Sequence, residues 1–285
     1  MSRQSRDHRR RGVQVRLTER DALLLEALVR FRLARTSDLA RIAFPDVRPT
    51  TAGLRLRRLF DAGYVEVRSG DRSEENVYTL GPYGHRWAEQ QNLAVGRVPR
   101  GGTAHHLAIV QSWSSVAAEL ARGPDGALEL ARADWDLREE FGARGVAIVP
   151  DLLLVLRVRE RTIALAVEVD LGTESLGVLR RKVEAYAELA GRRSGLFGYR
   201  EFALAVALGT PGRLAGVRQL LARLWEGRSL VWVLAAGSAE TLSGVLTELR
   251  GGGGGTATDP DYGNGGSSVV SASEFTRKQS GEEGL

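Results

Sequence analysis

The sequence predicts an α/β protein with an α+β front domain, followed by a second domain in which helices and strands alternate. Three observations predict this fold class. Residues 17–92 combine helical periodicity with one short β-hairpin, residues 104–250 alternate between helix and strand patterns, and residues 93–103 are a linker with glycine, proline and little periodicity. At 285 residues, the chain is long enough for two modest domains.

The composition excludes several classes of protein. The chain has no cysteine, which excludes disulfides, thiolate zinc sites and a cysteine nucleophile. No apolar run approaches the roughly 20 residues that span a bilayer, and no apolar segment follows the N-terminal arginines, so we expect a cytoplasmic protein without a membrane partner. Residues 1–16 and 251–285 are predicted to be a disordered basic arm and a disordered tail, because they contain too few apolar side chains to fold.

Charge is distributed unevenly along the chain, whose formal net charge is +5. Residues 1–100 hold 20 arginines against 12 acidic residues, whereas residues 101–285 hold 20 basic against 23 acidic residues. A basic front half favours nucleic acid as the partner of the first domain. The alternative explanation is a general preference for arginine, together with the basic arm.

Three helices are expected in the first domain. Thr18 caps the first helix, and Asp21 reaches back as the acidic partner of a capping box. The second helix begins near Thr36 and ends before Pro45, and the third ends at Asp61, before a glycine stop signal.

A β-hairpin with strands at residues 64–67 and 77–80 follows the third helix directly. Three helices and such a hairpin form a winged helix-turn-helix, in which the third helix enters the DNA major groove. Thr51, Arg55 and Arg58 share the face opposite the apolar stripe of that helix, so they are the candidate DNA-binding residues. The alternatives are a merely solvated helix face and a winged helix that docks proteins.

The second domain begins with a helix, continues with three meandering strands, and then crosses through a helix to a further strand. This αβββαβ order is the core of the restriction-endonuclease-like fold. Nearly continuous apolar runs in the second and third strands indicate burial on both faces. The expected helices lie at residues 105–121, 173–190, 212–225 and 239–249, and the expected strands at 128–133, 146–158, 162–170, 202–208 and 230–234.

The two apolar strands bring acidic residues together. A two-residue hairpin loop at residues 159–160 places Asp151 opposite Glu168, and Glu168 and Asp170 share one face of their strand. Buried carboxylates are costly unless a cation meets them. A divalent metal ion or Lys182 would supply that cation.

Lys182 is the remaining candidate site residue. Only two of the 40 basic residues are lysine, and the second, Lys278, lies in the tail. The two residue types are not interchangeable, because lysine is a compact point charge and arginine a planar fork. On the helical wheel Lys182 lies in the apolar arc between Val178 and Tyr186, so it points at the sheet. The alternatives are chance survival of one lysine and a structural ion pair with a strand carboxylate.

Roughly residues 17–200 contain the motifs LTERD, LRRLFDAGYV with VYTL, HHLAIV, PDLLLV, and VEVDLGTES followed by LRRKVEAY. Through these motifs the sequence resembles the replication-relaxation family. The resemblance implies a winged helix joined to a PD-(D/E)XK nuclease-like domain, and a link with plasmid replication and mobilisation. A histidine in HHLAIV is similar to the family pattern, so His105 or His106 is a weaker candidate for the cleft, as are Trp135 and Glu139.

The resemblance also implies a set of site residues. On the family pattern Asp151 supplies the acid of the PD motif and Glu168 the second carboxylate, so these two are the implied metal ligands. The lysine of the pattern belongs at position 170, where this sequence has Asp170, and Lys182 on the next helix is the candidate replacement. In an active enzyme Asp151 and Glu168, with or without Asp170, would hold Mg²⁺, and Lys182 would orient the attacking water.

Three functions are consistent with these observations. The first is a DNA-binding accessory protein of plasmid replication-relaxation or mobilisation, whose nuclease-like domain is catalytically reduced. The second is a Mg²⁺-dependent DNA endonuclease or nickase, and the third is a winged-helix transcriptional regulator with a non-catalytic back domain. The expected partners are double-stranded DNA, replication or mobilisation proteins and, in a homodimer, a second copy of the chain.

Overall fold

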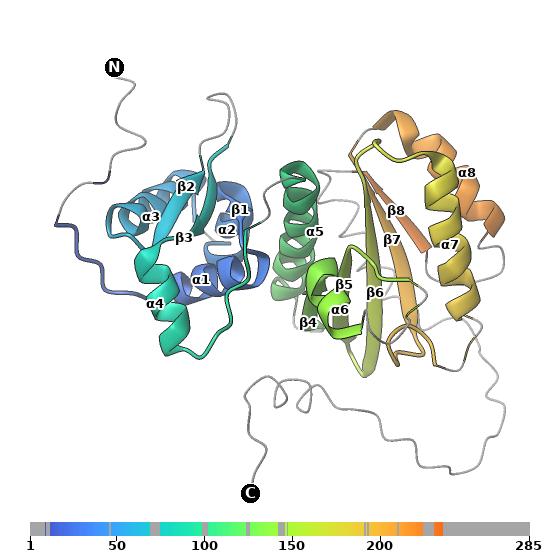
Figure 1. Cartoon of the computed structure of the whole chain (residues 1–285), viewed down its shortest axis with the longest axis horizontal. Coiled ribbons are helices and arrows are strands. Elements are labelled where there is room, and N and C mark those ends of the chain that lie inside the picture. The colour runs from blue at the N-terminus through green and yellow to red at the C-terminus, as the bar shows by residue number, and fades with distance from the viewer. Residues whose placement is uncertain are drawn as a thin grey trace, which may run out of the picture. The chain divides into compact units, whose positions relative to one another are not determined.

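The computed structural model divides the chain into two compact units, Met1–Ala118 and Glu119–Leu285 (Figure 1). The expected tail and final helix lie outside the described residues, as does most of the basic arm. Within the described part, no helix is long and apolar enough to cross a membrane. The structure describes residues 9, 12–45, 47–68, 75–98, 102–123, 126–141, 146, 148–190, 192, 194–209, 211–224 and 231–235.

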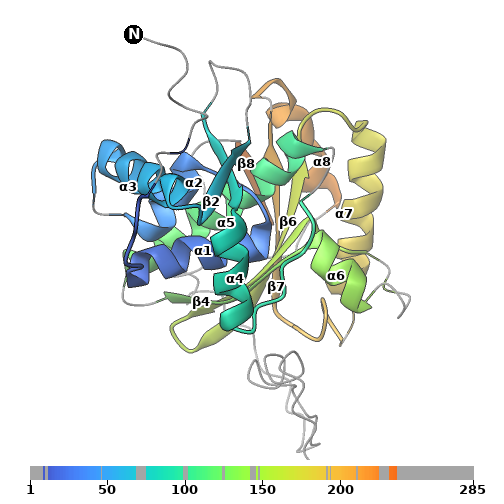
Figure 2. The ribbon, with the colours of Figure 1, turned by 60° about the vertical axis from the view of Figure 1, so that its left-hand side comes forward.

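The described part of the first unit consists of helices gathered around a small antiparallel sheet with the strand order β1-β3-β2 (Figure 2). The three expected helices and the two hairpin strands form, and the sequence interpretation missed the short strand β1 and helix α4. The elements are α1 (Glu19–Phe31), β1 (Ala34–Arg35), α2 (Thr36–Ala43), α3 (Pro49–Asp61), β2 (Val65–Arg68), β3 (Val77–Leu80), α4 (Pro82–Gln90) and α5 (Thr103–Ala121).

Helix α1 begins with the capping box that the sequence predicts. The backbone N–H and the hydroxyl of Thr18 donate to Oδ2 of Asp21 at 2.7 and 2.8 Å, and the N–H of Asp21 donates to Oγ1 of Thr18 at 3.4 Å. These bonds satisfy groups that a helix end otherwise leaves without partners. Behind the cap, Leu24, Leu28 and Phe31 are fully buried, so one face of α1 is anchored in the core.

The division between the units differs from the boundary that the sequence suggests. A linker at residues 93–103 would leave α5 entirely in the second domain. In the structure the division falls after Ala118, so most of α5 belongs to the first unit. The composition of a linker shows where the chain lacks periodicity, but it does not show which core the next helix joins.

Specific contacts explain why α5 joins the first unit. The rings of Trp113 and Phe31 lie 4.4 Å apart between centroids, and the ring N–H of His106 donates to the backbone carbonyl of Phe31. The hydroxyl of Ser114 donates to Oδ1 of the buried Asp38 on α2 at 3.0 Å. Because His106 is buried against α1, this histidine has a packing role in the first unit.

The second unit is built on a five-stranded sheet with the order β4-β5-β6-β7-β8 in its described part. The pairs β4–β5 and β5–β6 are antiparallel, whereas β6–β7 and β7–β8 are parallel. The sequence interpretation missed helix α6. The elements are β4 (Gly126–Ala133), α6 (Asp134–Phe141), β5 (Leu152–Val158), β6 (Arg161–Asp170), α7 (Leu176–Ala190), β7 (Phe202–Leu208), the 3₁₀ turn η2 (Pro211–Arg213), α8 (Leu214–Leu224) and β8 (Val231–Ala235).

The hairpin of β5 and β6 has the two-residue loop that the sequence predicts. Val158 pairs with Arg161, and the pairing continues without a shift to the first residue of β5. Continued by one step beyond that residue, the same register places Asp151 opposite Glu168. The register therefore brings two carboxylates to one end of the hairpin.

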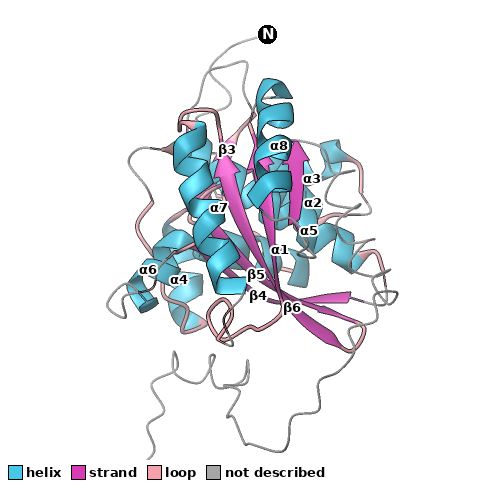
Figure 3. Ribbon diagram, turned by 90° about the vertical axis from the view of Figure 1, so that its right-hand side faces the viewer, coloured by secondary structure: helices cyan, strands magenta, loops and turns pink. Residues whose placement is uncertain are grey.

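Helices α7 and α8 cover one face of this sheet (Figure 3). From α7, Leu179, Val183 and Tyr186 pack against strand residues that include Leu204 and Val206 of β7. The apolar arc of α7 thus faces the sheet, as its sequence periodicity predicts. This orientation also directs Lys182, which lies on the same face of α7, toward β6.

Candidate functional site

Three carboxylates lie buried at the end of the β5–β6 hairpin. Asp151 precedes β5, while Glu168 and Asp170 occupy the last part of β6, and all three are almost fully enclosed. Glu168 is the most enclosed, with 2% of its surface exposed. Because a buried carboxylate is costly without partners, the donors around each acid determine what the site can do.

Glu168 is bound at both oxygens by side chains of α7. The Tyr186 hydroxyl donates to Oε1 at 2.6 Å, and the Lys182 ammonium lies 2.9 Å from Oε2. The ammonium also lies 3.4 Å from Oε2 of Glu174, which is half exposed. The structure therefore brings Lys182 to Glu168, and it adds two residues, Tyr186 and Glu174, that the sequence interpretation did not assign to the site.

The side chain of Asp151 contacts the backbone of the neighbouring strand β6. The N–H of Val169 donates to Oδ2 of Asp151 at 2.8 Å, and the backbone carbonyl of Asp151 accepts a bond from the N–H of Asp134 at 3.0 Å. The charge of Asp151 also acts on Glu168 and Lys182. Asp151 is thus fixed in place next to the Glu168–Lys182 pair.

Asp170 pairs with Arg213, whereas the sequence indicated only Lys182 or a metal ion as its cation. Its Oδ2 lies 3.0 Å from Nη2 of Arg213, and its Oδ1 accepts a bond from the N–H of Gly172 at 2.8 Å. Arg213 also donates to the backbone carbonyl of Glu174 at 2.6 Å. Asp170 therefore pairs with the arginine of the η2 turn rather than with Lys182, and no local sequence pattern indicates this partner.

The electrostatics of Glu168 are unusual for a glutamate. Burial raises its pKa to about 7, with a further contribution from the charge of Asp151, and these effects outweigh the contacts with Lys182 and Tyr186. Burial alone would lower the pKa of Lys182, but the charges of Glu168, Asp151 and Glu174 raise it on balance. Burial also raises the pKa of Tyr186 well above its ordinary value, so this phenol stays protonated and acts as a donor.

The predicted DNA-binding residues of α3 do not share one environment. Thr51 and Arg58 are exposed, and Leu54 between them has 69% of its surface exposed. Arg55 instead turns toward α1, where its Nε donates to Oδ1 of Asp21 at 2.8 Å and its Nη2 pairs with Oδ2. The Thr51, Leu54 and Arg58 side chains thus form the outward face, while Arg55 is engaged inside the unit.

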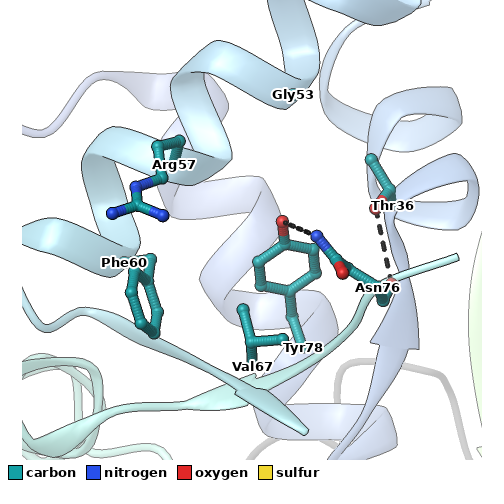
Figure 4. A pocket seen from close by; sticks show the side chains of 7 residues that line it. All are labelled: Thr36, Gly53, Arg57, Phe60, Val67, Asn76 and Tyr78. Atoms are coloured by element: carbon teal, nitrogen blue, oxygen red, sulfur yellow. Dashed lines mark hydrogen bonds between the residues drawn. The ribbon is translucent and has the colours of Figure 1, made fainter. Parts of the chain in front are cut away.

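A hollow of about 160 Å³ lies between α3 and the sheet of the first unit (Figure 4). Arg57 faces it from α3 but also pairs with Asp61 at 3.0 Å, and the amide of Asn76 donates to the Tyr78 hydroxyl at 3.5 Å. These contacts engage the polar groups of Arg57, Asn76 and Tyr78 that line the hollow. The hollow is lined by Thr36, Gly53, Arg57, Phe60, Val67, Asn76 and Tyr78.

Comparison with known proteins identifies the family. The family model described as replication-relaxation matches residues 25–198, which is more than half of the chain. The chain belongs to the replication-relaxation family. Its matched segment includes α3 and the acid–lysine cluster, which consists of Asp151, Glu168, Asp170, Glu174, Lys182 and Tyr186, whereas Arg213 lies outside the matched segment.

Other comparisons add little to this assignment. No curated protein matches the replication-relaxation chain significantly. Among solved structures, the restriction endonuclease FokI matches with 13% sequence identity and a TM-score of 0.32, over 84% of this chain and 46% of that one. The chain thus spans less than half of FokI, and a match at that TM-score says nothing about its activity.

The acid–lysine cluster of this replication-relaxation protein fits a divalent metal ion only in part. Carboxylate oxygens suit Mg²⁺, which often takes one or two carboxylates and keeps several waters. Asp151 and Glu168 could supply those ligands, but both oxygens of Glu168 already have donors in Tyr186 and Lys182. In the part of the chain that the structure describes, no group of three His, Asp or Glu residues is arranged to hold a metal. Metal binding through Glu168 would therefore share one of these oxygens with Tyr186 or Lys182, or displace one of the two donors.

The weaker candidates come from α5 and α6, and α6 begins at Asp134, whose N–H donates to the Asp151 carbonyl. His106 is buried against α1 in the first unit, and Glu139 is exposed on α6. Trp135 also lies on α6, where its side chain is partly buried.

Proposed function

We propose that this protein is a DNA-binding accessory factor of plasmid replication-relaxation or mobilisation, and that its first unit binds double-stranded DNA as a winged helix-turn-helix. The observation that carries the proposal is the outward face of α3, with Thr51 and Arg58 exposed beside the β2–β3 hairpin. Family membership supports the link to replication.

The topology of the first unit supports this proposal. Helices α1 to α3 are followed directly by a hairpin, and β1 adds a third strand in the order β1-β3-β2. In a winged helix-turn-helix the third helix enters the major groove and the hairpin contacts the sugar-phosphate backbone. On this proposal Arg58 and Thr51 contact DNA, whereas Arg55 holds α3 against α1 through Asp21.

Binding to duplex DNA at several salt concentrations tests the proposal. We expect Arg58→Ala to weaken binding about tenfold and to reduce the salt slope by about 1, as for the loss of one cationic contact. Arg86→Ala is the matched control, because Arg86 is an exposed arginine of the same unit on α4. Unchanged affinity and salt dependence in Arg58→Ala would rule out α3 as the DNA-contacting helix.

A second candidate function is Mg²⁺-dependent cleavage of a phosphodiester by the second unit. The observation that favours it is the meeting of Asp151, Glu168 and Lys182 at the end of one hairpin. A bound Mg²⁺ would polarise the phosphodiester and stabilise the leaving oxygen. Asp151 and Glu168 would hold the ion, and Lys182, once released from Glu168, would orient the attacking water and stabilise charge on the phosphate.

A nicking assay on supercoiled plasmid, with Mg²⁺ or Mn²⁺ and the full chain, separates the two functions. If the second unit is a nuclease, Asp151→Ala and Lys182→Ala abolish nicking, whereas Arg180→Ala on the exposed face of α7 retains it. If the wild-type chain cuts no DNA while it still binds duplex DNA, the nuclease candidate fails and the accessory function stands.

A further inference from the structure

Tyr186 is a buried residue that neither proposed function uses. It is fully buried on α7, one helical turn after Lys182, and its hydroxyl donates to Oε1 of Glu168 at 2.6 Å. A hydroxyl is costly to bury without a partner, whereas a phenylalanine would fill nearly the same space without that cost. The hydroxyl, rather than the ring, is therefore the feature that needs an explanation.

One helix face holds Glu168 at both oxygens. Tyr186 binds Oε1, and Lys182 lies 2.9 Å from Oε2. Residues four apart are neighbours on one helix face, so the two donors are fixed relative to each other by the backbone of α7. The terminal torsion of a glutamate is intrinsically broad. Two donors at a fixed spacing therefore define the plane of the Glu168 carboxylate.

Lys182 has a competing partner in Glu174. The ammonium lies 3.4 Å from Glu174, whose side chain is 49% exposed, whereas the side chain of Glu168 is 3% exposed. The lysine side chain itself is 30% exposed, so it has room to move outward. The ammonium is thus within ion-pair distance of both carboxylates, so a movement of Glu168 would change how the ammonium is shared between them.

We infer that Tyr186 is a positioning residue, whose hydroxyl fixes Glu168 so that the Lys182 ammonium is kept at the buried end of the cluster instead of moving out to Glu174. This arrangement does not depend on DNA binding by the first unit or on cleavage by the second. It applies to whatever chemistry Lys182 performs, because it sets where the charge of Lys182 resides.

The lysine composition of the chain provides a direct test. The only lysines are Lys182 and Lys278, so limited reductive methylation of the full chain, resolved by mass spectrometry, reports each amine separately. In Tyr186→Phe we expect Lys182 to react about three- to tenfold faster, because an amine that moves out toward the half-exposed Glu174 is more accessible to the reagent. Lys278 should react at an unchanged rate and serves as the internal standard.

Two further variants separate positioning from a loss of packing. Tyr199→Phe removes the hydroxyl of a half-buried tyrosine in the same unit, and it should leave the rate at Lys182 unchanged. In Glu168→Gln, Lys182 should already react fast, and adding Tyr186→Phe should give no further increase. The inference is overturned if a folded Tyr186→Phe protein shows the wild-type rate, or if its effect persists at full size in the Glu168→Gln background.

A substitution that keeps the ring and the hydroxyl covers the case in which Tyr186→Phe does not fold. With 3-fluorotyrosine at position 186 the hydroxyl is more acidic and a stronger donor, so Lys182 should react more slowly than in the wild type. A rate equal to that of the wild type in this folded protein would overturn the inference as well.

Discussion

Two buried carboxylates, one in each unit, show how the same kind of ion pair can have opposite electrostatic outcomes. Asp21 in the first unit is fully buried and pairs with Arg55, while Glu168 in the second unit is 2% exposed and pairs with Lys182. The pKa of Asp21 is lowered on balance, although burial acts to raise it. The pKa of Glu168 is raised to about 7.

The donors explain the difference. Asp21 accepts bonds from the Arg55 guanidinium and from both the N–H and the hydroxyl of Thr18. Glu168 has one ammonium and one phenol, and it also faces the like charge of Asp151. An ion pair whose hydrogen bonds are all satisfied is typical of a structural role. A carboxylate whose pKa is raised by burial and by a like charge is typical of functional sites. The comparison favours a structural role for Asp21 and makes Glu168 the candidate for a functional one.

Arg55→Ala should give the largest effect in this comparison. Removing one partner of a buried pair leaves an uncompensated charge, which costs about 3 kcal/mol or somewhat more of the free energy of unfolding. Hydrogen exchange of the full chain, resolved by mass spectrometry, should show the loss in the first unit only. Arg58→Ala, at an exposed position on the same helix, should change stability by less than about 0.5 kcal/mol. Equal effects of the two variants would contradict a structural role for Arg55.

Glu168→Gln should change how the stability of the second unit depends on pH. Between about pH 4.5 and 7 the folded state keeps the Glu168 proton that the unfolded state releases, so this residue lowers stability as pH rises through that window. The contribution is at most about 3 kcal/mol. Urea unfolding from pH 4.5 to 8 should show this decline in the wild type and a smaller one in Glu168→Gln. The raised pKa of Lys182 contributes stability that is constant below its ordinary value of 10.5, so it adds no pH dependence in this window.

Thr18→Ala should give the smallest of the three effects. It removes the hydroxyl that donates to Asp21 and caps α1, which costs about 1 kcal/mol. Thr18→Ser keeps the hydroxyl and should unfold at nearly the wild-type urea concentration. If Thr18→Ala is as damaging as Arg55→Ala, the guanidinium is not the main partner of Asp21.

Local patterns predicted a large part of both regions. The capping box at Thr18, the helices α1 to α3 and the β5–β6 loop all follow from residues close together in the sequence. The helical wheel also predicted that Lys182 faces the sheet, and the predicted strand register placed Asp151 opposite Glu168. Helix and strand periods are set by the backbone, so a sequence reveals which side chains share a face.

The partners across elements were not predictable in the same way. The helical wheel assigned Arg55 to the outward face of α3. A wheel cannot show that Asp21 of α1 lies within hydrogen-bond distance of Arg55. The pairing of Asp170 with Arg213 likewise joins β6 to a turn after β7. Both choices depend on how distant elements pack.

By itself, the sequence predicted the helices α1 to α3, the β5–β6 hairpin, and the place in the chain where the carboxylates and Lys182 come together. Only the tertiary structure decided that α5 packs on the first unit, that Arg55 is engaged by Asp21, and that Tyr186 completes the contacts of Glu168. The physical reason is that periodicity is local, whereas the partner of a buried charge is whichever donor the packed core brings within reach.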